Sequence, residues 1–100
     1  MKRRLIFRPE ARVDLLKAAL WYEEQTQGLG DRFIADLHGV LDRIVENPFQ
    51  FPKVIQDAHC ALLRKFPYKV YFRFVDDITK VLAVIHQHRH PDTWLDRLES

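Results

Sequence analysis

The sequence predicts an α+β domain in which a helical hairpin packs on one face of an antiparallel-rich sheet. Residues 9–47 contain two stretches with apolar residues at helical spacing, and a Gly-Leu-Gly turn separates them. Residues 58–87 contain three strand-like stretches, and residues 4–8 add a short one at the N-terminus. A chain of 100 residues can bury one such core but not two. We therefore expect a single domain over residues 1–100.

The first strand and the first helix follow from the chemistry around a proline. The segment RLIFR, residues 4–8, suits a short strand that Pro9 ends. Proline at the first position of a helix presets the backbone, so we expect a helix from Pro9 to about Thr26. The apolar residues that recur on this helix, and that we expect to be buried, are Val13, Leu16 and Leu20, joined by Leu15, Ala19 and Tyr22.

A second helix follows a turn that contains two glycines. Gly28 and Gly30 favour the backbone that ends the first helix, and Asp31 suits the start of the next one. The second helix should continue until Asn47 and Pro48 stop it. The residues expected on its buried side are Phe33, Leu37, Leu41 and Ile44, with Ile34 and Val45 beside them.

The second half of the chain has the pattern of a strand meander. The expected strands are residues 58–66, 69–75 and 80–87, the last with the apolar run VLAVI of a central strand. A hairpin turn is expected at residues 76–78. Residues 49–57 are expected to be a connection, in which a brief strand at residues 53–55 is left open. The C-terminal tail should add one short helix that holds Trp94 and Leu98 against the body.

Composition narrows the possible functions. The chain is 47% apolar and 30% charged, which is typical of a packed globular domain. One cysteine cannot form an internal disulfide, and no stretch approaches the roughly 18 apolar residues of a membrane span. We therefore expect a cytoplasmic protein without membrane contact. The GxSxG, P-loop and glycine-rich dinucleotide motifs do not occur, so no cofactor is expected.

Positive charge concentrates in residues 64–73, which hold four cations and no acid. Beyond Pro67 the residues alternate, so an extended chain turns one apolar side inward and leaves a cationic side. If the helices cover one sheet face, these cations can line the open face beside tyrosines that stack on bases. The candidate binding residues on this basis are Arg64, Lys65, Tyr68, Lys69, Tyr71, Arg73 and Arg89. For any one of them an ordinary solvated face remains the alternative.

Three histidines, His86, His88 and His90, alternate near the C-terminus. Imidazoles at this spacing can bind a metal, yet no cysteine or carboxylate stands at a recognisable metal spacing. No metal site is therefore predicted. General acid or base chemistry and a plain surface role both remain open for these side chains.

Four stretches form a series that spans nearly all of the chain: FRPEARVDLLKAALWYEEQTQGLGDRF, ENPFQFP, ALLRKFPYKVYFRF and VLAVIHQHRHPDTWLDR. In this order they resemble the RelE/ParE superfamily of toxins from bacterial type II toxin–antitoxin modules, which includes plasmid stabilisation proteins. The resemblance implies a small sheet with a helical hairpin. It also implies an antitoxin partner whose flexible C-terminal region folds over the toxin, and hence a toxin–antitoxin hetero-oligomer. The free toxin should expose an apolar groove near Trp21.

One branch of the superfamily consists of enzymes. RelE-like members are metal-independent endoribonucleases that cleave mRNA in the ribosome with basic side chains and usually a C-terminal tyrosine. The matching positions imply that Arg64 and Arg73 would hold the phosphate and that Arg89 would offset charge in the transition state. This chain has Trp94 in place of the tyrosine, and an indole has no proton to exchange. One of the histidines, with His88 as the candidate, would have to substitute.

The other branch acts by binding. ParE-like members bind DNA gyrase and trap it with its DNA broken, and the phrases LRKFPYKVYF and HRHPDTWLDR resemble this branch more closely. The resemblance then implies a protein-binding surface with Arg64, Tyr68, Arg89 and Trp94 as anchors. The sequence thus predicts a toxin that poisons gyrase. Ribosome-dependent mRNA cleavage and an antitoxin-binding module without toxicity are the alternatives.

Overall fold

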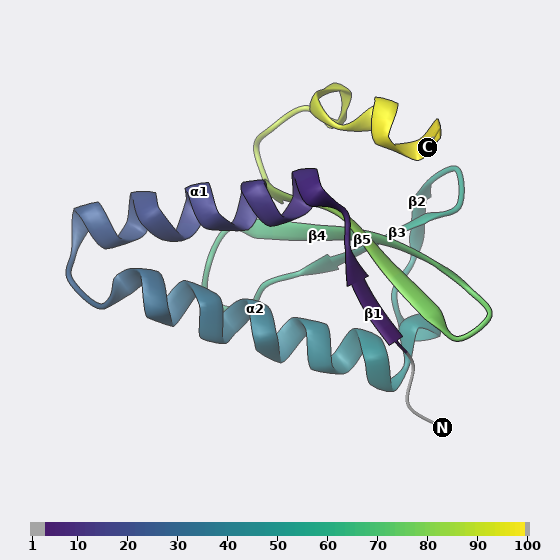
Figure 1. The fold of residues 1–100 in the computed structure, drawn as a ribbon, viewed down its shortest axis with the longest axis horizontal. Coiled ribbons are helices and arrows are strands. Elements are labelled where there is room, and N and C mark those ends of the chain that lie inside the picture. The colour runs from purple at the N-terminus through teal and green to yellow at the C-terminus, as the bar shows by residue number, and fades with distance from the viewer. Residues whose placement is uncertain (1–3, 100) are drawn as a thin grey trace.

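Residues 4–99 of the computed structural model form a five-stranded sheet with two helices on one face (Figure 1). The elements in chain order are β1 Arg4–Phe7, α1 Pro9–Gln25, α2 Leu29–Glu46, β2 Lys53–Ile55, β3 Ala58–Leu62, β4 Tyr68–Val75 and β5 Ile78–His86. Short 3₁₀ turns occur at Pro48–Gln50, Pro91–Thr93 and Leu95–Glu99. The predicted α+β class, with a helical hairpin on one sheet face, is confirmed. Within the described chain no helix is both long and apolar enough to cross a membrane.

The sheet has the order β1-β5-β4-β3-β2, so the apolar strand β5 is internal. Strand β1 pairs with β5 in parallel, and the remaining neighbours pair antiparallel. The brief strand at residues 53–55 does form, with Lys53 opposite His59, and raises the strands after the hairpin from three to four. Strands β3, β4 and β5 are therefore each paired on both sides, and the short strands β1 and β2 form the two edges of the sheet.

Strand β3 is shorter than predicted because a side chain captures its backbone. The strand ends at Leu62 rather than at Phe66. Just beyond the strand end, the two carboxylate oxygens of Asp36 accept hydrogen bonds from the backbone amides of Arg64, Lys65 and Phe66, at 3.2, 2.7 and 3.1 Å. Amides held in this way are not available to a neighbouring strand. Asp36 of α2 thus fixes residues 64–66 as a loop against the helix.

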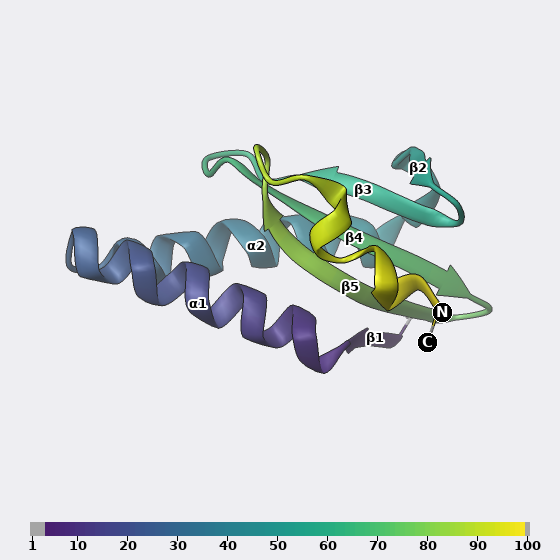
Figure 2. The same cartoon turned by 90° about the horizontal axis from the view of Figure 1, so that it is seen from above.

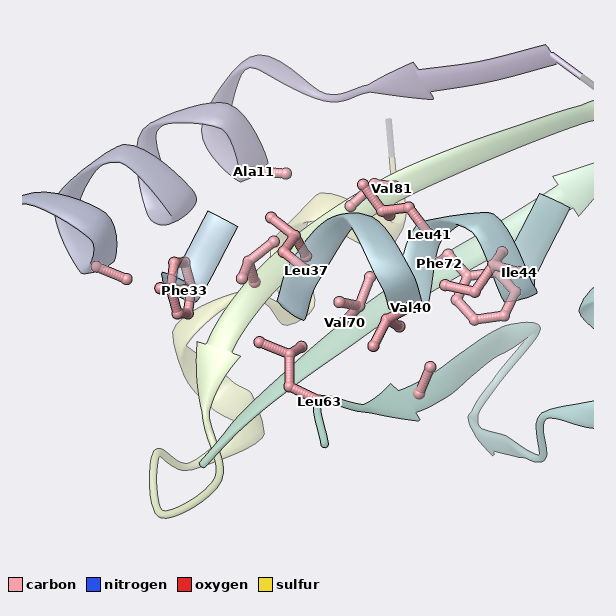
Figure 3. Close-up of a cluster of buried hydrophobic side chains, with 13 residues drawn as sticks. Ala11, Phe33, Leu37, Val40, Leu41, Ile44, Leu63, Val70, Phe72 and Val81 are labelled. Atoms are coloured by element: carbon pink, nitrogen blue, oxygen red, sulfur yellow. The ribbon is translucent and has the colours of Figure 1, made fainter. Parts of the chain in front are cut away.

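Helix α2 buries the predicted side. Phe33, Leu37, Leu41 and Ile44 are all buried, and Val40 joins them. They pack on Val70 and Phe72 of β4 and Val81 of β5 in the main core (Figure 3). The alternation of β4 is confirmed as well, because Tyr68, Val70, Phe72 and Phe74 all face this core.

Helix α1 buries only half of the residues predicted to be buried. Val13, Leu16 and Leu20 are exposed, with 47%, 57% and 62% of their surfaces accessible. Leu15, Ala19 and Tyr22 do face the core, as predicted, and Ala11 and Ala18 join them there. Both sets recur at helical spacing, so α1 is apolar on two opposite sides and periodicity could not choose between them. The alanines lie inward, which lets the helix approach its neighbours closely.

The turn between the helices depends on two glycines. Gly28 has a φ of 87°, a left-handed conformation that L-residues with a side chain rarely adopt. At Gly30 an added Cβ would lie 2.7 Å from the carbonyl oxygen of Ala19, so α2 can cross α1 only without a side chain there. Glu23 of α1 fastens the turn by accepting hydrogen bonds from the amides of Gly28 and Gly30 at 2.9 and 3.0 Å.

The C-terminal tail covers the sheet face opposite the helices (Figure 2). Trp94 is fully buried and Leu98 nearly so, as predicted for the tail. They pack in a second core with Tyr71, Leu82 and Ile85. This corrects the expectation that the second face is open. A run of residues apolar on both sides, as in β5, needs cover on both faces, and the tail supplies it.

Candidate functional site

Strand β4 does not gather the predicted cations on an open surface. Arg73 donates a hydrogen bond to Asp57 at 2.7 Å in an ion pair. The ammonium of Lys69 lies 5.6 Å from the centroid of the Tyr71 ring, and Tyr71 itself is buried. Of the predicted cationic face, one side chain is neutralised and one covers an aromatic ring of the second core.

Trp94, a predicted anchor, belongs to the core. Its ring centroid lies 4.1 Å from that of Tyr71 at a tilt of 34°, and no part of the residue is exposed. A largely buried ion pair fastens the tail beyond it, because Arg97 donates hydrogen bonds to Asp14 of α1 at 2.7 Å and to the carbonyl of Leu82 at 2.9 Å. Neither Trp94 nor Tyr71 can stack on an incoming base or partner while the tail is in place.

Arg89 instead contributes to a cleft beside α1. The cleft has a volume of about 340 Å³, and we call it the α1 cleft; its lining residues include Asp14, Lys17, Trp21, Tyr68, His86 and Arg89. Trp21 is 55% exposed, which agrees with the apolar exposure predicted near it. Burial raises the pKa of the Tyr68 phenol, against the opposing effect of the Arg89 charge. The phenol therefore stays protonated at neutral pH.

The three histidines do not act as one group. The Nδ1 atom of His86 accepts a hydrogen bond from the backbone amide of His88 at 3.1 Å, which requires that this nitrogen carry no proton. His88 is exposed, and its ring lies 5.3 Å from that of His86. His90 contacts Asp92 at 3.2 Å. Among residues 4–99 no three His, Cys, Asp or Glu side chains gather in a way that suits a metal ion.

Arg64 and Lys65 line a larger hollow on the other side of the hairpin. It has a volume of about 650 Å³ between α2 and the loop after β3, and we call it the α2 groove; its lining residues include Arg32, Asp36, Gly39, Arg43, Arg64 and Lys65. The floor consists of small and apolar side chains, among them Ala35, Val40 and Phe66. Four cations thus surround one hollow.

The candidate catalytic residues lie in separate places. Arg64 lines the α2 groove, Arg89 lines the α1 cleft, and Arg73 is paired with Asp57. In the β4–β5 register Tyr68 lies opposite His86 and Arg73 opposite Lys80, so Arg73 and the α1 cleft are at opposite ends of the strand. Five residues of strand correspond to about 17 Å. Arg73 is therefore not assembled with Arg89 around one phosphate.

Two surfaces were not predicted from the sequence. The first contains Arg32 and Arg43, which were not among the candidate residues, although residues 32, 36, 39 and 43 share one helix face by their spacing. The second is the exposed set Val13, Leu16 and Leu20, which we call the α1 outer stripe. The sequence signal for the stripe was that apolar residues recur at helical spacing on two sides of α1.

A family comparison matches most of the chain. The model of the ParE toxin of the type II toxin–antitoxin system, parDE, matches residues 5–91. No curated protein matches the chain.

Three solved structures have the same fold. A chain of the chromosomal ParDE toxin–antitoxin system from P. aeruginosa superposes with a TM-score of 0.75 at 15% identity, covering 85% of this chain and 96% of the other. A mutant of the E. coli toxin RelE in the free state superposes with a TM-score of 0.68 at 17% identity, covering 99% and 97%. A RelBE toxin–antitoxin complex from Mycobacterium tuberculosis gives a TM-score of 0.60 at 17% identity, covering 86% and 99%. At these identities the likeness concerns the fold alone.

Proposed function

Because the chain belongs to the ParE family of toxins from type II toxin–antitoxin systems, we propose that it arrests growth by poisoning DNA gyrase and that a cognate antitoxin neutralises it. The observation that carries this proposal is the burial of Trp94. The position at which a ribonuclease of the superfamily usually offers a tyrosine is here a fully buried core residue. A toxin that acts by binding needs no proton donor there.

The dispersal of the arginines supports the same choice. Phosphodiester cleavage needs basic side chains that converge on one phosphate together with a proton donor and acceptor. Here Arg73 is engaged by Asp57 and Arg64 and Arg89 line different hollows. Separate cationic and aromatic patches suit the large interface of a protein complex better than a compact catalytic centre.

The decisive experiment compares the two targets directly. Purified toxin is incubated with gyrase and supercoiled plasmid, and in parallel with programmed ribosomes and mRNA. We expect linear plasmid to accumulate after detergent and protease treatment, and the mRNA to remain intact. Cleaved mRNA with unaffected gyrase would establish the ribonuclease alternative. A toxin inactive in both assays that still binds its antitoxin would establish the binding module without toxicity.

The antitoxin is proposed to cover the α1 outer stripe. Three exposed aliphatic side chains one helical turn apart form an apolar strip, and exposed Trp21 lies beside it. A partner that buries such a strip gains about 25 cal/mol for each Å² of apolar surface removed from water. An amphipathic helix that forms on binding fits a strip of this kind.

A further inference from the structure

The α2 groove holds an unusual excess of positive charge. Arg32, Arg43, Arg64 and Lys65 all line it, and none of them has an ion-pair partner among the described residues. Outside the groove, Arg8, Arg73 and Arg97 are each paired with a carboxylate, whereas Arg4, Arg12 and Arg89 are not paired within the described chain. What distinguishes the groove is that four unpaired cations line one hollow. Like charges around one hollow repel one another. An unpaired cluster of this kind is best explained by an anionic ligand.

The one described carboxylate that lines the groove, that of Asp36, is already engaged in hydrogen bonds. Asp36 accepts hydrogen bonds from the backbone amides of Arg64, Lys65 and Phe66, so its oxygens point toward the loop backbone. These bonds also hold the loop that carries Arg64 and Lys65 against α2. Asp36 therefore positions two of the four cations instead of pairing with them.

The geometry of α2 spreads the charge along a line. Arg32 and Arg43 are 11 residues apart on one helix face, which corresponds to about 16 Å along the axis. Between them Gly39 has no neighbour within 4 Å of an added Cβ, so the middle of the groove is open. The guanidinium of Arg43 lies 5.9 Å from the centroid of the Phe51 ring. The groove is thus a cationic track with an unobstructed centre.

We propose that the α2 groove binds the phosphate backbone of duplex DNA, so that the toxin itself contacts DNA. The choice of duplex DNA rests on the proposed function, in which the target works on DNA. Duplex DNA presents one charge for each ~1.7 Å of its axis, and therefore supplies anions along the full length of the track. A peptide would need several carboxylates concentrated in a few residues to do the same. Three of the four cations are arginines, whose planar fork suits phosphate oxygens.

The test measures binding of the full-length toxin to a fluorescent 20-base-pair duplex by anisotropy, without gyrase. With four contacts the logarithm of affinity should fall against the logarithm of salt concentration with a slope of about −3.6. The charge-reversal variant Arg32→Glu/Arg43→Glu should bind at least about tenfold more weakly, with a slope of about −1.8. The control Arg12→Glu/Lys53→Glu changes the net charge equally at exposed sites outside the groove.

A second groove variant tests whether any loss of duplex binding comes from the changed charge or from misfolding. Gly39→Glu places a carboxylate in the open centre of the groove without a steric clash, and Gly39→Ala is its neutral control. The melting temperature should not fall in either variant, and antitoxin binding should be unchanged in both. Polyglutamate and single-stranded RNA, each with about 40 negative charges like the duplex, serve as competitors.

Loss of duplex binding in both groove variants, with normal binding by both controls and weaker competition by polyglutamate and RNA, supports the proposal. It is overturned if the wild type does not bind the duplex at 50 mM salt, if the controls lose binding equally, or if polyglutamate or RNA binds more tightly. Gyrase poisoning is scored separately. Linear plasmid without duplex binding by the isolated toxin would refute the groove assignment alone, and duplex binding without linear plasmid would refute the proposed target alone.

Discussion

Helices α1 and α2 pack on the same sheet face, yet they turn different chemistry outward. The outer side of α1 carries Val13, Leu16 and Leu20, all about half exposed or more. The outer side of α2 carries Arg32 and Arg43, which face Arg64 and Lys65 across a groove. One surface is apolar without a covering layer, and the other is cationic without counter-charges among the described residues.

The difference indicates two partners with different physical demands. An apolar strip binds through removal of water, which gives short-range attraction that depends little on salt. A cationic track attracts its ligand over about a Debye length and weakens as salt rises. A hairpin with both surfaces can therefore hold a neutralising protein on one helix and contact its target on the other. Variants that affect one surface and spare the other test this separation.

The largest effect is expected from Trp94→Ala, which damages the scaffold under both surfaces. The side chain is fully buried against Tyr71, and removal of such a ring typically costs about 3 to 5 kcal/mol of unfolding free energy. Denaturant unfolding followed by circular dichroism measures it. Trp21→Ala is the matched control, because Trp21 is 55% exposed and should cost less than about 1 kcal/mol. Equal losses in the two variants would contradict the assignment of Trp94 to the core.

The next-largest expected effect distinguishes the α1 outer stripe from the α2 groove. Leu16→Glu/Leu20→Glu places two charges in the α1 outer stripe and should weaken binding of the cognate antitoxin by about 100-fold, measured by calorimetry. Stability and duplex binding should stay unchanged, because both side chains are exposed and lie outside the α2 groove.

The control Val54→Glu/Leu62→Glu introduces the same charges at similarly exposed apolar positions of the sheet. It should leave antitoxin binding within about threefold of the wild type. A loss as large as that of the α1 double variant would mean that the antitoxin does not depend on the α1 outer stripe.

The two helices also show what the sequence could predict about the fold. For α2, Phe33, Leu37, Leu41 and Ile44 stand opposite charged residues, so periodicity identified the buried side correctly. For α1 both sides are apolar, so the prediction combined residues of the two, and Val13, Leu16 and Leu20 were wrongly placed in the core. The inward side carries alanines because the helix lies close to β5 and α2. The distance between packed elements depends on tertiary structure, and the spacing of apolar residues along one helix does not reveal it.

The candidate site was harder to predict than the fold. The cations of residues 64–73 are close in sequence, and a continuous strand would have left Lys65, Lys69 and Arg73 on one face. The capture of the loop by Asp36, 28 to 30 residues away, instead sends Arg64 and Lys65 to α2. Trp94 was expected both to pack on the body and to anchor a partner, and its burial decides between the two. Both outcomes depend on long-range contacts that local patterns do not encode.

A moderate effect is expected on the α2 side alone from Asp36→Ala. The substitution leaves the amides of Arg64, Lys65 and Phe66 without their acceptor, and should cost about 1 to 3 kcal/mol of unfolding free energy. Hydrogen exchange should show faster exchange of these three amides while the amides of α1 stay protected. Asp36→Asn, which keeps one carbonyl oxygen as an acceptor, should recover part of the loss. Unchanged exchange at residues 64–66 would show that Asp36 does not hold the loop.

The smallest expected effect is a gain in stability. Gly39 lies within α2 and faces open space, so Gly39→Ala should raise the unfolding free energy by about 0.5 to 1 kcal/mol through helix propensity alone. A methyl group adds no charge and reaches little of the groove, so duplex binding should be unchanged. Gly30→Ala is the contrasting variant, because its Cβ would meet the carbonyl of Ala19 at 2.7 Å and the helices would have to separate. Thermal melting should therefore move in opposite directions at the two glycines, and the same sign at both would contradict the close crossing of α1 and α2.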